Sequence, residues 1–134
     1  MGSLSVFLNP VKTENKEVII SDRFQENGKP VPFVIRPITQ AENEELMKKH
    51  RKVDKQGVEI FNRIQYNQEL AAAAVVEPPL NNAELQKCYG VLGASKLLSV
   101  MLYAGEYATL LEEIQKLSGF DMDINDDIEE AKNE

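Results

Sequence analysis

The sequence contains a single cysteine and a single histidine, and this scarcity excludes several kinds of site. Cys88 has no partner for a disulfide within the chain, which is typical of a reducing compartment. The usual zinc site, built from about four Cys and His ligands, is excluded as well. Cys88 shares a helical face with Leu85 and Leu92, so we predict an inert, buried thiol. A dyad with His50 is the alternative, but His50 lies in the Lys48–Lys52 basic run and is predicted to be a solvated helix end.

Long apolar runs and an excess of basic residues are also missing. The longest run without a polar side chain is Leu70–Val76, whereas a membrane span needs about 20 residues. The first residues show no basic region followed by an apolar core, so we expect no signal peptide and a cytosolic protein. The net charge of −7 and a pI near 4.8 argue against a general nucleic-acid binder.

The motifs that carry chemistry are incomplete. Asp121–Asp126 resembles the start of a calcium loop, but such a loop needs glycine at its sixth position and glutamate at its twelfth. Asp126 and Lys132 hold those positions here. Gly90–Gly93 lacks the lysine and the preceding strand of a phosphate-binding loop. We therefore predict no catalytic residue, no cofactor and no metal, and a protein that is not an enzyme.

The acidity is concentrated at one end of the chain. Residues 121–134 hold seven Asp and Glu residues and one lysine, a net charge of −6, which leaves −1 of the total −7 for residues 1–120. This stretch has little apolar surface to offset the entropy cost of ordering, so we predict an acidic, disordered tail.

The first part of the chain predicts a β-hairpin. Residues 1–16, interrupted by Pro10, are interpreted as a flexible arm. Apolar and polar side chains then alternate through residues 17–36, with Asn27-Gly28 as the turn. Pro32 cannot donate a backbone hydrogen bond, which predicts an edge strand or one paired on a single side.

Residues 40–119 predict helices. Thr39 and Glu42 form a capping-box pattern before a charged helix that reaches about His50, and residues 51–57 are interpreted as a loop. A central helix is predicted from Asn62 to Val76, ended by Pro78-Pro79.

Three further apolar stripes follow at helical spacing, one of them capped by Asn81 or Asn82 and the last ended by Gly119. The predicted fold class is α+β and mainly α-helical, with the N-terminal hairpin packed on a bundle of about five helices. We expect a single globular domain over residues 17–120.

Apolar and aromatic side chains around the joint between the last two helices are candidates for a partner-binding groove. Met and Tyr are common on adaptable binding surfaces, although most apolar residues in this half are expected to be core. The candidate residues are Leu97, Met101, Tyr103, Tyr107 and Leu111.

Several stretches, in order along nearly the whole chain, together resemble the XkdN-like phage tail assembly chaperones. In the first half these are SDRF at 21–24, GKPVPF at 28–33 and IRPIT at 35–39. In the second half they are AAAAVVEPPL at 71–80, AELQKCYGVLGA at 83–94 and MLYAGEYATLLEEIQKLSGFD at 101–121.

The resemblance implies an accessory protein of a long-tailed phage or prophage, made in the bacterial cytoplasm and absent from the finished virion. Such chaperones bind the tape measure protein, keep it soluble and help recruit tail-tube subunits. In several tail-chaperone families a ribosomal frameshift adds a C-terminal domain, and residues 121–134 would then form the junction. Self-association stays open.

Two other functions are left open. One is a structural tail component of the tail-completion type that remains in the virion, and the other is a helical host adaptor. Neither requires a catalytic site, so the partner and the fate of the protein distinguish them.

Overall fold

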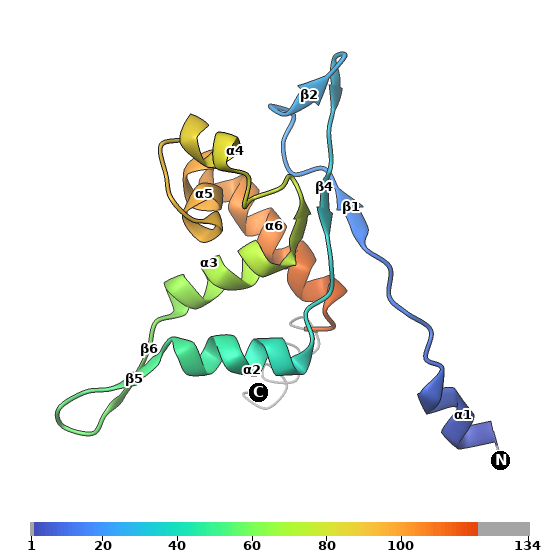
Figure 1. The fold of residues 1–134 in the computed structure, drawn as a ribbon, viewed down its shortest axis with the longest axis vertical. Helices are drawn as coiled ribbons and strands as arrows, with labels where there is room; N and C mark the ends of the chain where they lie inside the picture. Colours follow the sequence, from blue (N-terminus) through green and yellow to red (C-terminus); the bar gives the residue numbers. More distant parts are fainter. Residues whose placement is uncertain (1, 121–134) are drawn as a thin grey trace, which may run out of the picture.

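The computed structural model describes residues 2–120, which form small antiparallel sheets and a set of helices (Figure 1). The helices are α1 (Gly2–Leu8), α2 (Gln40–Lys49), α3 (Arg63–Ala74), α4 (Ala83–Cys88), α5 (Ala94–Met101) and α6 (Ala104–Leu117). The strands are β1 (Lys16–Val18), β2 (Gln25–Glu26), β3 (Lys29–Pro30), β4 (Phe33–Ile35), β5 (Arg51–Val53), β6 (Glu59–Phe61) and β7 (Val75–Glu77). The predicted α+β, mainly helical fold class is confirmed.

The predicted hairpin forms, with its turn at the expected residues. β1 and β4 pair in antiparallel register, with Val18 opposite Phe33, and β2 and β3 form the tip. Asn27 and Gly28 both have positive φ angles, 53° and 77°, as a tight hairpin turn requires. The expectation that Pro32 marks an edge strand is wrong, because β4 is the middle strand of the order β1-β4-β7. Pro32 lies one residue before β4, so its missing N–H removes no ladder hydrogen bond.

The central helix ends two residues earlier than predicted. Asn62 is its N-cap, and its side chain accepts a hydrogen bond from the backbone N–H of Gln65. α3 ends at Ala74 rather than Val76 because the following residues form β7, in which Val75 lies opposite Ile35. The N–H of Arg36 donates to the carbonyl of Ala74 over 2.8 Å, which joins the helix end to the sheet.

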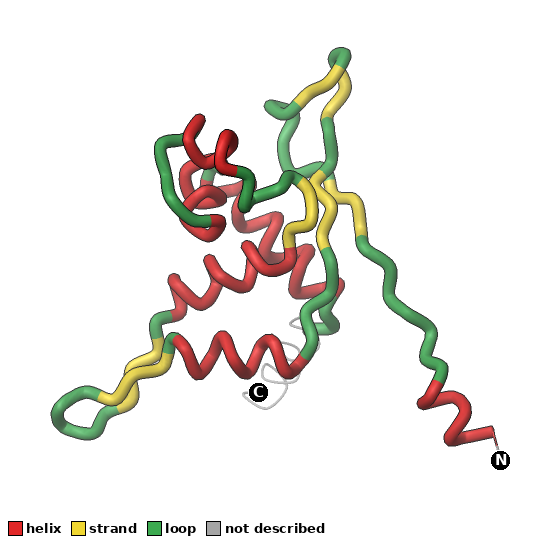
Figure 2. The backbone as a smooth tube through the Cα atoms, viewed as in Figure 1, coloured by secondary structure: helices red, strands yellow, loops and turns green. Residues whose placement is uncertain are grey.

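The segment after α2 is a β-ribbon and not the predicted loop. β5 and β6 pair in antiparallel register, and Figure 2 shows them projecting beyond α2 and α3. The turn is held by Asp54, whose carboxylate accepts hydrogen bonds of 2.9 Å from the N–H groups of Gln56 and Val58. Asp, Ser and Asn side chains favour turns by this local bonding, so Asp54 was the sequence signal for the ribbon.

The other predicted helix ends are confirmed. Thr39 and Glu42 form the capping box of α2, and Asn82 caps α4 by accepting from the N–H of Leu85 at 2.9 Å. Gly119 has a φ of 82° just after α6, and the N–H of Phe120 bonds back to the carbonyl of Gln115 at 2.8 Å. This is the glycine-ended C-cap that satisfies carbonyls of the last helical turn.

The predictions for the two ends of the chain are only partly addressed by the structure. α1 occupies the predicted arm, and its large apolar side chains, including Leu4, Phe7 and Leu8, are exposed. The flexibility of residues 1–16 stays a prediction. The predicted disordered tail and the calcium-like stretch Asp121–Asp126 lie outside the described residues.

The core brings β4 together with α3, α5 and α6. α3 packs against α2, α5 and α6, with its most extensive contact on α5. Six large side chains are almost completely buried: Ile35, Leu70, Leu97, Leu98, Leu110 and Ile114. The prediction that Cys88 is buried is wrong. Leu85 on the short helix α4 and Tyr89, its C-cap, pack against the core, while Cys88 at the helix end is exposed.

Truncation of Leu110 tests the core. Leu110 on α6 is 0% exposed, so Leu110→Ala should lower the free energy of unfolding by about 2–5 kcal/mol, as cavity-forming substitutions do. Urea denaturation followed by circular dichroism measures this loss. Leu92→Ala is the matched control, because Leu92 is 90% exposed and should change stability by less than about 0.5 kcal/mol. Equal losses for the two variants would contradict this core.

Candidate functional site

An apolar pocket opens between the hairpin, the segment after β7 and the end of α5. Its volume is about 210 Å³. The lining residues come from three parts of the chain that are far apart in sequence: Phe24, Val31, Pro32 and Phe33, then Glu77, Pro78 and Pro79, and finally Met101. A concave apolar surface with few polar groups is the usual form of a binding site for an apolar side chain.

The walls of the apolar pocket are aromatic rings and proline rings. The Phe24 and Phe33 rings pack with centroids 5.9 Å apart and an interplanar angle of 40°. Pro32, Pro78 and Pro79 offer no backbone N–H, and the peptide bond between Glu77 and Pro78 is cis. The pocket therefore presents carbon atoms with few hydrogen-bond donors, which suits an apolar occupant.

Arg23 joins the rim of the pocket to the loop between α5 and α6. Its guanidinium carbon lies 4.0 Å from the centroid of the Tyr103 ring and 5.0 Å from that of Phe24. It donates to the carbonyl of Met101 over 3.1 Å and to both carboxylate oxygens of Glu106. Such stacking and forked bonding are specific to arginine. The cluster fixes Tyr103 beside the pocket.

The Arg23–Glu106 pair is held in its charged form. The hydrogen bond from Arg23, with further bonds from Ser21 and the backbone N–H of Tyr103, lowers the pKa of Glu106 to about 2. The hydrogen bond with Glu106 raises the pKa of Arg23 in turn. The Arg23–Glu106 ion pair beside the pocket therefore persists at neutral pH.

The five predicted partner-binding residues separate into two groups. Met101 lines the pocket and is 6% exposed, and Tyr103 at the rim is 67% exposed. Leu97 is fully buried in the core, and Tyr107 and Leu111 are half-buried at its edge. Burial raises the pKa of Tyr107, whose hydroxyl has no hydrogen-bond partner among the described residues. In the isolated chain, Met101 and Tyr103 are the two predicted residues that reach the apolar pocket or its rim.

Sequence reasoning missed most of the pocket. Phe24 and Phe33 were assigned to strands, Pro32 to an edge, and Pro78-Pro79 to a helix stop. The sequence did hold a signal for the pocket. The stretches around Pro32 and around Pro78-Pro79 contain large apolar residues, and their prolines prevent a continuous strand ladder or helix. Nothing local shows that these stretches face each other.

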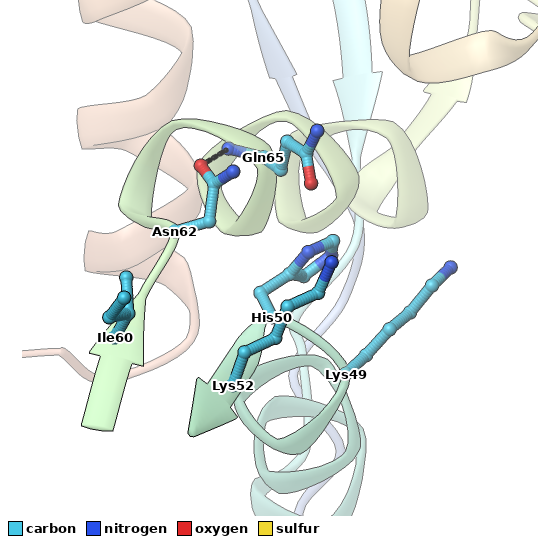
Figure 3. A pocket seen from close by; sticks show the side chains of 6 residues that line it. All are labelled: Lys49, His50, Lys52, Ile60, Asn62 and Gln65. Atoms are coloured by element: carbon cyan, nitrogen blue, oxygen red, sulfur yellow. Dashed lines mark hydrogen bonds between the residues drawn. The ribbon is translucent and has the colours of Figure 1, made fainter. Parts of the chain in front are cut away.

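A second, basic pocket lies at the base of the β5–β6 ribbon, with a volume of about 270 Å³. Figure 3 shows its lining residues, Lys49, His50, Lys52, Ile60, Asn62 and Gln65. The prediction that His50 is solvated is wrong. His50 is 7% exposed, and its Nε2 lies 2.6 Å from a carboxylate oxygen of Glu69 on α3.

Glu69, the partner of His50, is held in its charged form. Burial alone would raise the pKa of Glu69, but hydrogen bonds from Lys49 and His50 lower it overall. The Glu69 carboxylate, two residues before the four alanines of α3, thus ties the end of α2 to the central helix. Sequence reasoning considered His50 as a helix end or as a partner of Cys88, and so missed this contact with Glu69.

Comparisons with known proteins agree with one another. The family model described as phage XkdN-like tail assembly chaperone protein matches residues 4–132. The phage-like element PBSX protein XkdN of Bacillus subtilis (strain 168) is 30% identical, over 97% of this chain and 93% of that protein. The uncharacterized protein YqbN of the same strain is 33% identical with the same coverage.

A solved structure resembles most of the fold. The crystal structure of the protein YqbN superposes with a TM-score of 0.74 at 27% identity, over 87% of this chain and 96% of that one. Separately, none of the helices within residues 2–120 is long and apolar enough to cross a membrane.

Neutralisation of Glu106 tests the ion pair between Arg23 and Glu106 beside the pocket. A folded-state pKa lowered from 4.5 to about 2 means that the ionised carboxylate stabilises the fold above the unfolded pKa, and that this stabilisation is lost as the pH falls through about 2. Glu106→Gln should therefore weaken the dependence of the unfolding free energy on pH between about 5 and 2. Denaturation curves measured at several pH values across that range give this dependence. An equal dependence on pH for the unmodified chain and for Glu106→Gln would contradict a stabilising Arg23–Glu106 ion pair.

Proposed function

The chain belongs to the phage XkdN-like tail assembly chaperone family, and we propose that it binds the tape measure protein, keeps it soluble and helps recruit tail-tube subunits around it. The observation that carries the proposal is the open apolar pocket beside Tyr103. A tape measure protein presents apolar helix faces that have no partner until the tube closes. An apolar side chain of such a helix fits this pocket, in the helix-in-groove mode of recognition.

The exposed apolar residues next to the pocket support this use. Val31 on the hairpin side is 40% exposed and Tyr103 on the helical side is 67% exposed, so a docked helix contacts both. Burial of one large apolar side chain contributes roughly 1.5–3 kcal/mol, and aromatic residues are enriched at the centres of such interfaces. Arg23 contacts Phe24 on one side and Met101 and Tyr103 on the other, so it links the two sides of the pocket.

The proposed activity needs no chemistry at the site. Binding and release of an apolar helix require no cofactor, because tail-tube protein can displace the chaperone by covering the same helix face. We propose a non-catalytic protein that acts in the bacterial cytoplasm during tail assembly and is absent from the finished virion.

A charge placed at the pocket rim tests the proposed contact. Val31 is exposed and its backbone N–H bonds to the carbonyl of Phe24, so Val31→Asp leaves the hairpin bonding intact. It should weaken binding of the tape measure protein at least about tenfold, because a charge at a desolvated apolar contact costs more than 1.4 kcal/mol. Co-expression followed by pull-down and measurement of the soluble fraction gives the readout.

Val53→Asp is the matched control, because Val53 is 65% exposed on the β5–β6 ribbon. It should bind like the unmodified chain. Met101 and Tyr107 are less suitable targets, since both are at least partly buried and a charge there would unfold the protein. A tape measure protein that neither binds nor gains solubility with the unmodified chain would contradict the proposal.

Analysis of finished particles separates this function from that of a structural tail component. Mass spectrometry of purified tails should detect the tape measure and tail-tube proteins without stoichiometric amounts of this chain. Its presence at a fixed ratio to a known tail protein would mean that it is a virion component.

A further inference from the structure

Residues 48–63 form a basic surface on a chain that is acidic overall. They hold six Lys and Arg residues against Asp54 and Glu59, a net charge of +4, whereas the whole chain carries −7. All six basic side chains are exposed: Lys48, Lys49, Arg51, Lys52, Lys55 and Arg63.

Within the part of the chain that the structure describes, most of these cations have no acidic partner. Lys49 pairs with Glu69 at 2.6 Å, and Arg51 pairs with Glu59 at 3.6 Å. Within residues 2–120, the structure gives no ion pair to the remaining four, Lys48, Lys52, Lys55 and Arg63. An acidic segment that binds here therefore meets positive charge that the fold has not already neutralised.

The basic surface is also hollowed and partly apolar. Lys49 and Lys52 flank the basic pocket, Ile60 forms one wall, and Asn62 and Gln65 lie across from the lysines (Figure 3). Val58 and Ile60 on the ribbon are more than half exposed, at 57% and 53%. A fitting ligand thus carries carboxylates with a few apolar side chains between them.

We propose that residues 121–134 of the same molecule bind this basic surface. Their seven carboxylates are interspersed with Met122, Ile124 and Ile128, which matches the mixture of lysines and exposed apolar residues around the basic pocket. The occupant is the chain's own acidic segment, and the contact is independent of the proposed tape measure site at the apolar pocket.

Residues 121–134 follow α6 closely enough to reach the basic pocket. The N–H of Ile38, just before α2, donates to the hydroxyl of Ser118 over 2.9 Å, so the end of α6 lies beside the start of α2 (Figure 1). α2 has ten residues and is about 15 Å long. Fourteen extended residues span up to about 46 Å, so the acidic segment can follow α2 to the basic pocket.

Tethering makes weak ion pairs sufficient. Exposed ion pairs are individually weak and are screened by salt, but a segment on the same chain has an effective concentration in the range of about 1 mM. The contact covers the basic surface and makes its exposure dependent on ionic strength. An acidic partner has to displace residues 121–134 before it binds there.

A spin label on the acidic segment tests the contact in the full chain. Cys88→Ser removes the exposed thiol, and Asn125→Cys carries a nitroxide. At low salt the label should broaden the amide signals of residues 48–63 in ¹⁵N-labelled protein. The broadening should be lost at about 1 M salt, where the Debye length is about 3 Å.

Charge reversal and a mixing experiment decide the occupant. Lys48→Glu with Lys52→Glu should abolish the broadening, whereas Lys87→Glu with Lys96→Glu, two exposed lysines elsewhere, should retain it. The amide spectrum of each variant verifies the fold. Broadening that is absent, spread without preference, or unchanged by the first pair overturns the proposal. In the mixing experiment, spin-labelled ¹⁴N protein is added to ¹⁵N protein that carries no spin label. If the signals of the ¹⁵N protein broaden, the occupant is a second copy of the chain and the proposal is overturned.

Discussion

The structure depends on the close packing of α3 against its neighbours. Ala71 and Ala74 are completely buried, and their small side chains let α5 and α6 approach the helix while Leu70 fills the space between them. The same helix end holds the sheet, because the carbonyl of Ala74 accepts the N–H of Arg36. β4 and β7 are therefore fixed relative to the helices, and with them both walls of the apolar pocket. A larger residue in place of either alanine would displace the helices and the hairpin together.

Features set by neighbouring residues could be predicted from the sequence, and features set by distant contacts could not. The capping box at Thr39, the caps at Asn62 and Asn82 and the glycine end at Gly119 each follow from a few consecutive residues. The end of α3 depends on pairing of β7 with a strand about 40 residues away, and the burial of His50 depends on Glu69 across a helix interface.

The candidate site follows the same division. Met101 and Tyr103 were predicted from an apolar cluster at one helix joint, and they do border the pocket. The opposing walls, Phe24 to Phe33 and Pro78-Pro79, are contributed by segments that only tertiary packing brings together. Arg23 shows the difficulty most clearly, since a charged residue on the hairpin side stacks on Tyr103 about 80 positions later. Such a contact leaves no periodic signal in the sequence.

The central claim is that the apolar pocket is the surface that receives a tape measure helix. Hydrogen–deuterium exchange of the chain, alone and bound to the tape measure protein, tests it most directly because each backbone amide reports its own protection. The account predicts slower exchange in the complex at the amides of residues 24–31 and 102–107. Protection confined to the β5–β6 ribbon or to α4, with no change beside the pocket, would contradict it.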